Sequence, residues 1–439
     1  MTDVDLASEL RLPCGATLPN RIAKSAMTEG LADEYNRATD RHVRLYQRWS
    51  EGGAGLLITG NVMIDRHILE RPGNVAIDGN GGLEALRRWV RAGTAGGNHL
   101  WMQISHAGRQ SPKYVTREPV APSEVQLKLG GSYARPRALT DDEITDLVRR
   151  YGEAARVARE TGFTGVQVHG AHGYLISSFL SPVVNRRADR WGGSLQNRAR
   201  FLIEVLHSVR RAVGDDFPVG LKLNSADFQK GGFTHEECLQ VVRWLNDTGL
   251  DLLEISGGTY EQPRLLGYEG QAATADLPPR ESTRRREAYF LEYAADIRRI
   301  AAMPLMVTGG FRSRAAMDQA LAGDELDVVG LARPMCVRTD VPARLLDGSM
   351  QRAPAWENEV RLGRGWLGPN SPVFPLKIVN IMGQQGWYYL QLLRLGDGRE
   401  PDTGMGVLRG LLGNLRNELR TARALRHAAP GETLESQGT

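Results

Sequence analysis

The chain has 439 residues, 41% hydrophobic and 24% charged, which is typical of a globular protein and excludes wholesale disorder or a fibrous repeat. Its acidic start, MTDVDLASEL, lacks the apolar core of a secretory leader, and no window approaches the length of a membrane span. The chain has 55 Lys and Arg residues against 51 Asp and Glu residues, and residues 404–428 carry five arginines against one glutamate. The rest of the chain is therefore neutral, so we expect a cytoplasmic protein that neither spans a membrane nor binds nucleic acid.

The three cysteines, Cys14, Cys238 and Cys336, lie far apart and form no C-x-x-C pair. They cannot build a disulfide framework, a cysteine-held zinc site or an iron–sulfur site within one chain. Any redox chemistry of this protein therefore needs an organic cofactor.

Eight short apolar runs alternate with longer amphipathic segments in the first 348 residues. The runs cover residues 21–28, 55–64, 99–105, 165–170, 218–224, 250–257, 305–310 and 327–333. Several are apolar almost throughout, as expected of parallel strands covered on both faces. Eight such strand-plus-helix units predict an α/β fold, a (β/α)8 TIM barrel over residues 1–348. A doubly wound sheet is the alternative, but KSAMTEG after the first run is not the glycine fingerprint that it requires.

The segments between the runs carry helix signals. The clearest helix is Asp141–Glu160 after an N-cap at Thr140, a second follows Ser194, and Thr234 with Glu237 forms a capping-box pattern before a third. Residues 11–18, with a Cys-Gly turn, predict a hairpin that plugs the barrel floor. Residues 108–138, rich in Gly, Pro and Ser, predict a long loop over the active face.

The alternation stops after residue 348, and residues 349–439 are predicted to form a partly helical C-terminal extension. It contains the run WYYLQLLRL and an Arg-rich helix with one apolar stripe, made of Leu408, Leu411, Leu412, Leu415, Leu419, Ala422 and Leu425. This stripe indicates packing on the barrel or on a second subunit, so a homo-oligomer formed through the extension is an open alternative. A membrane-surface helix is less favoured, because the stripe lacks Trp and Phe.

Functional groups of TIM barrels project from the carboxyl ends of the strands. TGGFRS places Gly309 and Gly310 between the seventh run and a helix begun near Ser313, and GLAR places Arg333 just past the eighth. Glycine amides, a helix N-terminus and a cation predict a phosphate site, although a tight turn alone would also explain the glycines.

Two histidines and a tyrosine, His169, His172 and Tyr174, leave the fourth run together in VHGAHGYL. Metal ligation by the histidines is disfavoured, because no nearby carboxylate or cysteine completes a ligand set. Two packed or capping histidines would be the ordinary interpretation of this segment.

The stretch HGAHGYLISSFLSPVVNRRADRWGGSLQNRARF, residues 169–201, resembles the signature of the Old Yellow Enzyme family of FMN-dependent ene reductases and NAD(P)H:flavin oxidoreductases. PNRIAKSAMT, QISHAGRQ, the TGG turn and GLARP match the family as well. The resemblance covers roughly residues 8–345 and leaves the extension outside.

The resemblance implies noncovalent FMN across the barrel mouth, with NADPH or NADH as reductant. The FMN phosphate would lie at Gly309, Gly310, Leu331, Ala332 and Arg333, where backbone amides and a guanidinium bind a dianion. Thr28 would bond the flavin near O4 and N5, Gln103 its pyrimidine edge, and Lys222 its N1 and O2, where the family usually has Arg. Further contacts would come from Ser25, Ala26, Met27, Gly60 and Asn61.

The resemblance also gives the histidine pair a mechanism. His169 and His172 would grip the oxygen of a carbonyl or nitro group, hydride from the flavin would add to the conjugated C=C bond, and Tyr174 would protonate the α carbon. The substrate is then a small electron-poor alkene. An NAD(P)H oxidase, quinone reductase or nitroester reductase of the same fold is the nearest alternative. An aldolase-type barrel with Lys222 as a Schiff base and a non-catalytic flavin-binding scaffold are more remote ones.

Overall fold

The computed structural model describes residues 4–258 and 290–428. Its main sheet is parallel and contains β3 (Ile22–Lys24), β4 (Leu56–Met63), β6 (His99–Ser105), β9 (Gly165–Gly170), β10 (Val219–Asn224), β11 (Leu252–Ser256), β12 (Leu305–Thr308) and β13 (Val328–Leu331). Because β3 pairs with both β13 and β4, these strands close into a barrel. The predicted (β/α)8 fold is confirmed.

Several strands end earlier than the apolar runs predict. β3 stops at Lys24 instead of residue 28, β12 at Thr308 instead of 310, and β13 at Leu331 instead of 333. Gly309 and Gly310 have φ values of 115° and 92°, which take the chain out of the sheet. The residues beyond these strand ends therefore line the mouth of the barrel instead of extending its wall.

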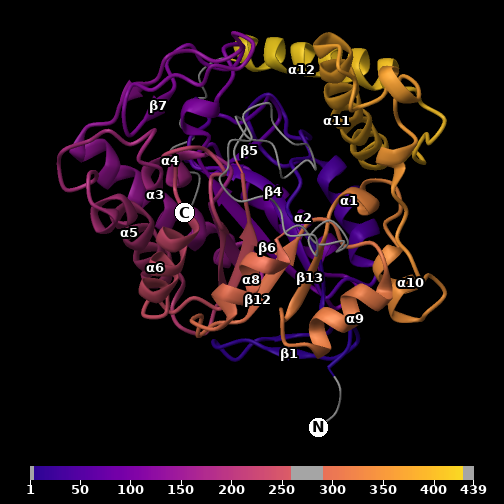
Figure 1. Ribbon diagram of the computed structural model, residues 1–439, viewed down its shortest axis with the longest axis horizontal. Coiled ribbons are helices and arrows are strands. Elements are labelled where there is room, and N and C mark those ends of the chain that lie inside the picture. Colours follow the sequence, from indigo (N-terminus) through magenta and orange to yellow (C-terminus); the bar gives the residue numbers. More distant parts are fainter. Residues whose placement is uncertain (1–3, 259–289, 429–439) are drawn as a thin grey trace, which may run out of the picture.

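Helices surround the barrel (Figure 1). They are α1 (Asp40–Ser50), α2 (Leu83–Gly93), α3 (Asp141–Glu160), α5 (Leu195–Val213), α6 (His235–Leu245), α8 (Leu291–Arg298), α9 (Arg314–Ala322) and α10 (Val341–Leu346). The predicted helix Asp141–Glu160 is confirmed, and Thr140 forms a reciprocal capping box with Glu143. The Ser194 hydroxyl caps α5, and Thr234 with Glu237 caps α6, both as predicted.

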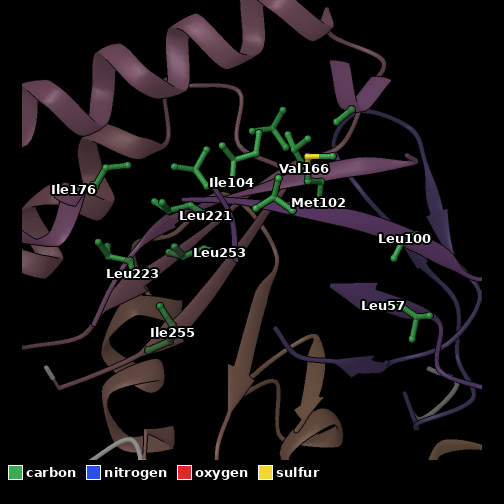
Figure 2. Close-up of a cluster of buried hydrophobic side chains, with 14 of the residues drawn as sticks. Leu57, Leu100, Met102, Ile104, Val166, Ile176, Leu221, Leu223, Leu253 and Ile255 are labelled. Carbon is green, nitrogen blue, oxygen red and sulfur yellow. The ribbon is translucent and has the colours of Figure 1, made fainter. Parts of the chain in front are cut away.

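The strands send alternate side chains to opposite faces of the barrel wall. Leu57, Leu100 and Leu253 belong to the outer layer of buried side chains, between strands and helices (Figure 2). Their neighbours point inward and form a separate apolar cluster, which contains Leu56, Ile58, Trp101, Leu252, Met306 and Val328. The hairpin of β1 (Leu10–Arg11) and β2 (Thr17–Leu18) adds Leu10, Leu12 and Leu18 to this cluster, so the predicted floor plug is confirmed.

The inward positions nearer the carboxyl ends of the strands are polar instead. Gln103, Gln167, Lys222 and Glu254 are each less than 5% exposed and alternate with outward apolar residues of the same strands. The barrel thus has an apolar floor and a polar upper layer, and the upper layer forms the base of the candidate site.

The extension packs on the outside of the barrel through α11 (Phe374–Gly396), which lies against α1. Arg41 pairs with Asp397 at 2.8 Å and Arg48 with Glu400 at 2.9 Å, while Trp387 is fully buried. The last helix, α12 (Val407–His427), then crosses α11. A Cβ on Gly386 would lie 2.5 Å from the carbonyl oxygen of Gly410, so the two helices approach closely only because this position is glycine.

Only part of the predicted apolar stripe of α12 packs on the rest of the protein. Leu408, Leu412, Leu415 and Leu419 are 52%, 64%, 48% and 42% exposed, whereas Gly410 and Ala422 are buried. Near its start, the close glycine contact turns the helix so that Gly410, rather than Leu408 or Leu412, faces α11. The stripe is therefore divided: four leucines are exposed, while Ala422 is buried and Leu425 packs against the main core cluster. No helix in the described part of the chain is long and apolar enough to cross a bilayer.

Candidate active site

The turn after β9 fixes the backbone of His172 in an uncommon conformation. Its φ is +64°, the left-handed region that non-glycine residues seldom adopt. Its N–H donates to Asn224 Oδ1 at 3.1 Å, and its carbonyl accepts from Gln110 Nε2 at 3.0 Å. Hydrogen bonds from the end of β10 and from the segment after β6 thus hold this strained turn in place.

This turn brings the three predicted catalytic side chains together. The His169 ring lies 5.1 Å from the His172 ring and 4.8 Å from the Tyr174 ring, centre to centre, in edge-to-face arrangements. His169 and Tyr174 are 3% and 4% exposed. The structure therefore places all three in one cluster at the mouth of the barrel, in which His169 and Tyr174 are buried and His172 is half-buried.

Both histidine rings are neutral at pH 7. Burial lowers the pKa of His169 well below its usual value, and burial together with the Lys222 ammonium lowers the pKa of His172 to about 3. The N–H of Ala171 donates to His169 Nδ1 at 3.2 Å, so the ring proton is on Nε2, which is a hydrogen-bond donor. His172 Nε2 lies 2.7 Å from Ser256 Oγ, a partner that the sequence did not reveal.

A continuous chain of polar contacts crosses the upper layer of the barrel. Gln103 Nε2 donates to Gln167 Oε1 at 2.7 Å, and Gln167 Nε2 donates to Glu254 Oε2 at 2.7 Å. The other oxygen of Glu254 lies 3.0 Å from Lys222 Nζ and accepts from Thr308 Oγ1 at 2.6 Å. Lys222 is therefore not an isolated cation, because a buried carboxylate neutralises it.

Sequence reasoning missed Gln167 and Glu254, although a usable signal existed. Both occupy inward positions of predicted strands, and Glu254 stands directly opposite Lys222 in the register of β10 and β11. A charged residue at an inward position of a parallel strand needs a partner from a neighbouring strand. Determining which alternate residues of each strand point into the barrel would have found this pair.

The β3 and β4 side of the mouth carries two further carboxylates that the sequence analysis did not single out. Thr28 Oγ1 donates to Glu70 at 2.8 Å, and Asn61 Nδ2 donates to Thr28 Oγ1 at 3.5 Å. Glu29 accepts from the Gly60 N–H at 2.9 Å and from the Tyr46 hydroxyl. Glu29 and Glu70 were missed because no motif marks them.

The remaining predicted residues of this side lie in the same region. Ser25 is buried and its hydroxyl lies 2.8 Å from Thr308 Oγ1, while Ala26 and Met27 are half-buried. A Cβ on Gly60 would lie 2.5 Å from the Met27 carbonyl oxygen. Gly60 therefore lets β4 contact the segment after β3, and this contact positions residues 25–28.

The predicted phosphate residues meet where β12 and β13 end. Gly309 and Gly310 precede α9, and Leu331 and Ala332 precede Arg333, which starts the turn η3 (Arg333–Cys336). Glu357 of the extension lies 2.5 Å from Arg312 and 3.9 Å from Arg333. Burial opposes ionisation of Glu357, yet Arg333 and Arg312 lower its pKa. The extension thus supplies a carboxylate next to the predicted phosphate arginine.

The site fits FMN on its own chemistry. Asn61 Oδ1 is buried at the mouth and has no hydrogen-bond partner among the described residues, an arrangement that costs free energy unless a ligand donor satisfies it. The left-handed glycine pair in front of α9 and the guanidinium groups of Arg312 and Arg333 suit a dianion. The amide of Gln103 and the ammonium of Lys222 supply donors between them.

Comparison with known proteins agrees with this geometry. Residues 14–351 match the model of the NADH:flavin oxidoreductase / NADH oxidase family. The chain belongs to this family, the Old Yellow Enzymes. Like its relatives, this Old Yellow Enzyme is an oxidoreductase, with FMN as cofactor and NAD(P)H as reductant.

Among curated proteins, the chain is 36% identical over 363 residues to the NADH-dependent flavin oxidoreductase iliE of a Neonectria species, covering 78% of this chain and 47% of that protein. It is 34% identical over 363 residues to the NADH-dependent flavin oxidoreductase iccE of Talaromyces variabilis, covering 78% and 86%. The chain thus spans about half the length of the first relative and most of the second.

Among solved structures, the old yellow enzyme homologue of Zymomonas mobilis superposes with a TM-score of 0.67 at 25% identity, covering 80% of this chain and 95% of that one. The family match ends at residue 351, so α11 and α12 lie beyond it.

Proposed function

We propose that this Old Yellow Enzyme reduces the C=C bond of α,β-unsaturated carbonyl or nitro compounds. The observation that supports this proposal is the cluster of His169, His172 and Tyr174, in which the His169 ring contacts both the second imidazole and the phenol. An oxidase that passes electrons to dioxygen has no need of a proton donor placed in this way. Bound FMN supplies the hydride, which it takes from NAD(P)H.

The two histidines bind the substrate oxygen. His169 donates from Nε2, since its Nδ1 already accepts from the backbone. His172 donates from Nδ1 when Ser256 donates to its Nε2, which fixes the ring proton on the nitrogen that is free for the substrate. Both donors stabilise the negative charge that develops on the oxygen, and their low pKa values keep them neutral donors across the physiological range.

Tyr174 then gives its hydroxyl proton to the carbon next to the activating group. Its ring packs against His169, so the same turn that positions the oxygen donors positions the acid. A tyrosine hydroxyl has an ordinary pKa near 10, so it is protonated at neutral pH.

The residues proposed to bind FMN are those expected from the sequence. Gly309, Gly310, Leu331, Ala332 and Arg333 hold the phosphate of FMN in this proposal. The ring system is bound by Ser25, Ala26, Met27, Thr28, Gly60, Asn61, Gln103 and Lys222.

The replacement Tyr174→Phe tests the proposal. Reduction of simple enones is expected to fall by about 10²-fold or more, whereas quinone reduction and FMN reduction by NADH stay nearly unchanged, because quinones take protons from water. Tyr151→Phe is the matched control, since Tyr151 is a buried tyrosine of α3 whose hydroxyl has no hydrogen-bond partner in residues 4–258 and 290–428. Equal losses on enone and quinone would point to disturbed packing, and no loss on either would remove Tyr174 from the mechanism.

We further propose that the chain divides into a barrel of residues 1–348 and an extension of residues 349–439. The same proposal includes a cytoplasmic location and a homo-oligomer formed through the extension. The three cysteines are free thiols, which suits a reducing compartment. The exposed leucines of α12 are the surface on which a second copy would pack. Light scattering on the purified protein measures the oligomeric state.

A further inference from the structure

A shallow surface cavity of about 620 Å³, wide open to solvent, lies between the segment after β6 and the end of α12. It is lined by Lys113, Tyr114, Arg117, Gly131, Ser132, Ala134 and Arg426. Two of its walls belong to one loop, in which Lys113 N–H donates to the Ser132 carbonyl at 2.9 Å. The third wall is the end of the extension, which Figure 1 shows beside this loop near β7 (Val120–Ala121).

Specific contacts fix α12 to the loop. Arg426 Nη2 donates to the Tyr114 carbonyl at 2.9 Å, and the Tyr114 hydroxyl donates to Glu418 at 2.9 Å. Glu418 also pairs with buried Arg71 at 2.9 Å. Tyr114 is therefore held by α12 at both its backbone and its side chain, and the cavity is a built feature of the fold.

The charge of the cavity is strongly one-sided. Lys113, Arg117 and Arg426 have no carboxylate partner within the described part of the chain, and no acidic residue lines the cavity. Glu418, which contacts the loop, is already paired with Arg71 and accepts from Tyr114. The C-terminal dipole of α12 offsets only about half of one positive charge. Three unpaired cations around one cavity favour an anionic ligand.

The cavity also lies near the candidate active site. Gln110, which binds the His172 carbonyl, is only three residues from Lys113. Three residues span at most about 11 Å, so the Lys113 backbone lies within that distance of the Gln110 backbone, whose side chain contacts the histidine turn. A volume of about 620 Å³ also exceeds what a bare ion needs and suits part of an organic molecule.

We propose that this cavity binds a phosphate or carboxylate group of one of the two substrates, and that the C-terminal extension completes the site with Arg426. The anion is either a phosphate of the reduced nicotinamide dinucleotide or an acidic group of the alkene. The inference rests on the two-substrate reaction of the family and not on alkene reduction as such.

Titration of the holoenzyme with sodium pyrophosphate at low ionic strength tests binding directly. Arg426→Gln and Arg117→Gln are each expected to weaken binding threefold to tenfold, whereas Arg426→Lys retains it. Arg423→Gln is the matched control, because Arg423 is exposed on the same helix but does not line the cavity. Absence of pyrophosphate binding, or equal weakening by the control, overturns the proposal. A failure of alkene reduction leaves this measurement unaffected, so the two proposals fail separately.

Anaerobic flavin reduction then identifies the source of the anion. If Arg426→Gln weakens NADPH or NADH at least threefold but leaves the phosphate-free 1-benzyl-1,4-dihydronicotinamide unchanged, the dinucleotide supplies it. If only an alkene that carries a carboxylate loses affinity relative to neutral cyclohexenone, the oxidising substrate supplies it. Unchanged kinetics with all of these compounds overturns the proposal, even where pyrophosphate binds.

Discussion

The two sides of the barrel mouth solve the problem of burying polar groups in opposite ways. The donor half, which consists of His169, His172, Tyr174 and Ser256, contains no formal charge at pH 7 and presents N–H and O–H groups. The carboxylate half, which consists of Thr28, Glu29, Asn61 and Glu70, surrounds two acids with hydroxyl, amide and backbone donors. Between them stands the neutralised pair of Lys222 and Glu254.

This difference separates two tasks. Neutral donors with low pKa values can stabilise charge that appears only during the reaction. Carboxylates that already accept hydrogen bonds are rigid acceptors, so they fix the orientation of Thr28 and of the backbone at Gly60. We therefore expect the donor half to control turnover of the alkene and the carboxylate half to control cofactor retention.

The largest effect is expected from the histidine pair. His169→Ala or His172→Ala should lower kcat/KM for enones by about 10²-fold or more, the usual cost of a lost donor to a developing oxyanion. Reduction of the flavin by NADH should change by less than about threefold. Stopped-flow measurement of the two half-reactions checks this, and equal losses in both would show that the halves do not differ in task.

Glu70→Gln should give the opposite pattern. The Thr28 hydroxyl loses a charged acceptor, so Thr28 and Asn61 lose their fixed orientation. We expect FMN to dissociate about tenfold more readily, or about 1.4 kcal/mol. Alkene turnover per bound flavin should be preserved. Fluorescence of released flavin measures retention, and a variant that keeps FMN but loses enone turnover would contradict this assignment.

Ser256 should have a smaller effect, because it acts through His172. Ser256→Ala should lower enone turnover by about five- to tenfold, with the loss in kcat rather than in the KM for NADH. Ser256→Thr keeps the hydroxyl and should restore activity. If Thr and Ala variants behave alike, the hydroxyl does not set the ring proton of His172 and the effect is one of packing.

The smallest effect concerns acid stability. The folded pKa of His172 is about 3, below its value near 6.5 in an unfolded chain, so the unfolded state binds more protons between these pH values. The free energy of unfolding therefore falls as pH drops through this window. His172→Gln should make the decline shallower by at most about 1.4 kcal/mol per pH unit, one proton's share. Urea midpoints from pH 7 to 4 measure it, and His67→Gln, an exposed site, should leave the slope unchanged.

The sequence by itself determined the barrel and one half of its mouth. Eight apolar runs with capped helices between them define the fold, because hydrophobic periodicity and caps are local signals. His169, His172 and Tyr174 lie within six consecutive residues, so a single turn collects them and a linear motif reveals them.

Only the tertiary structure decided the rest of the site. Glu254 meets Lys222 through strand register, Glu70 meets Thr28 across 42 residues, and Arg426 reaches Tyr114 across 312. The orientation of α12 also escaped the sequence, since its leucine stripe predicts a buried face while four of its leucines are exposed beside a glycine contact with α11. Such contacts depend on barrel closure and on how closely two backbones approach, neither of which leaves a local pattern in the chain.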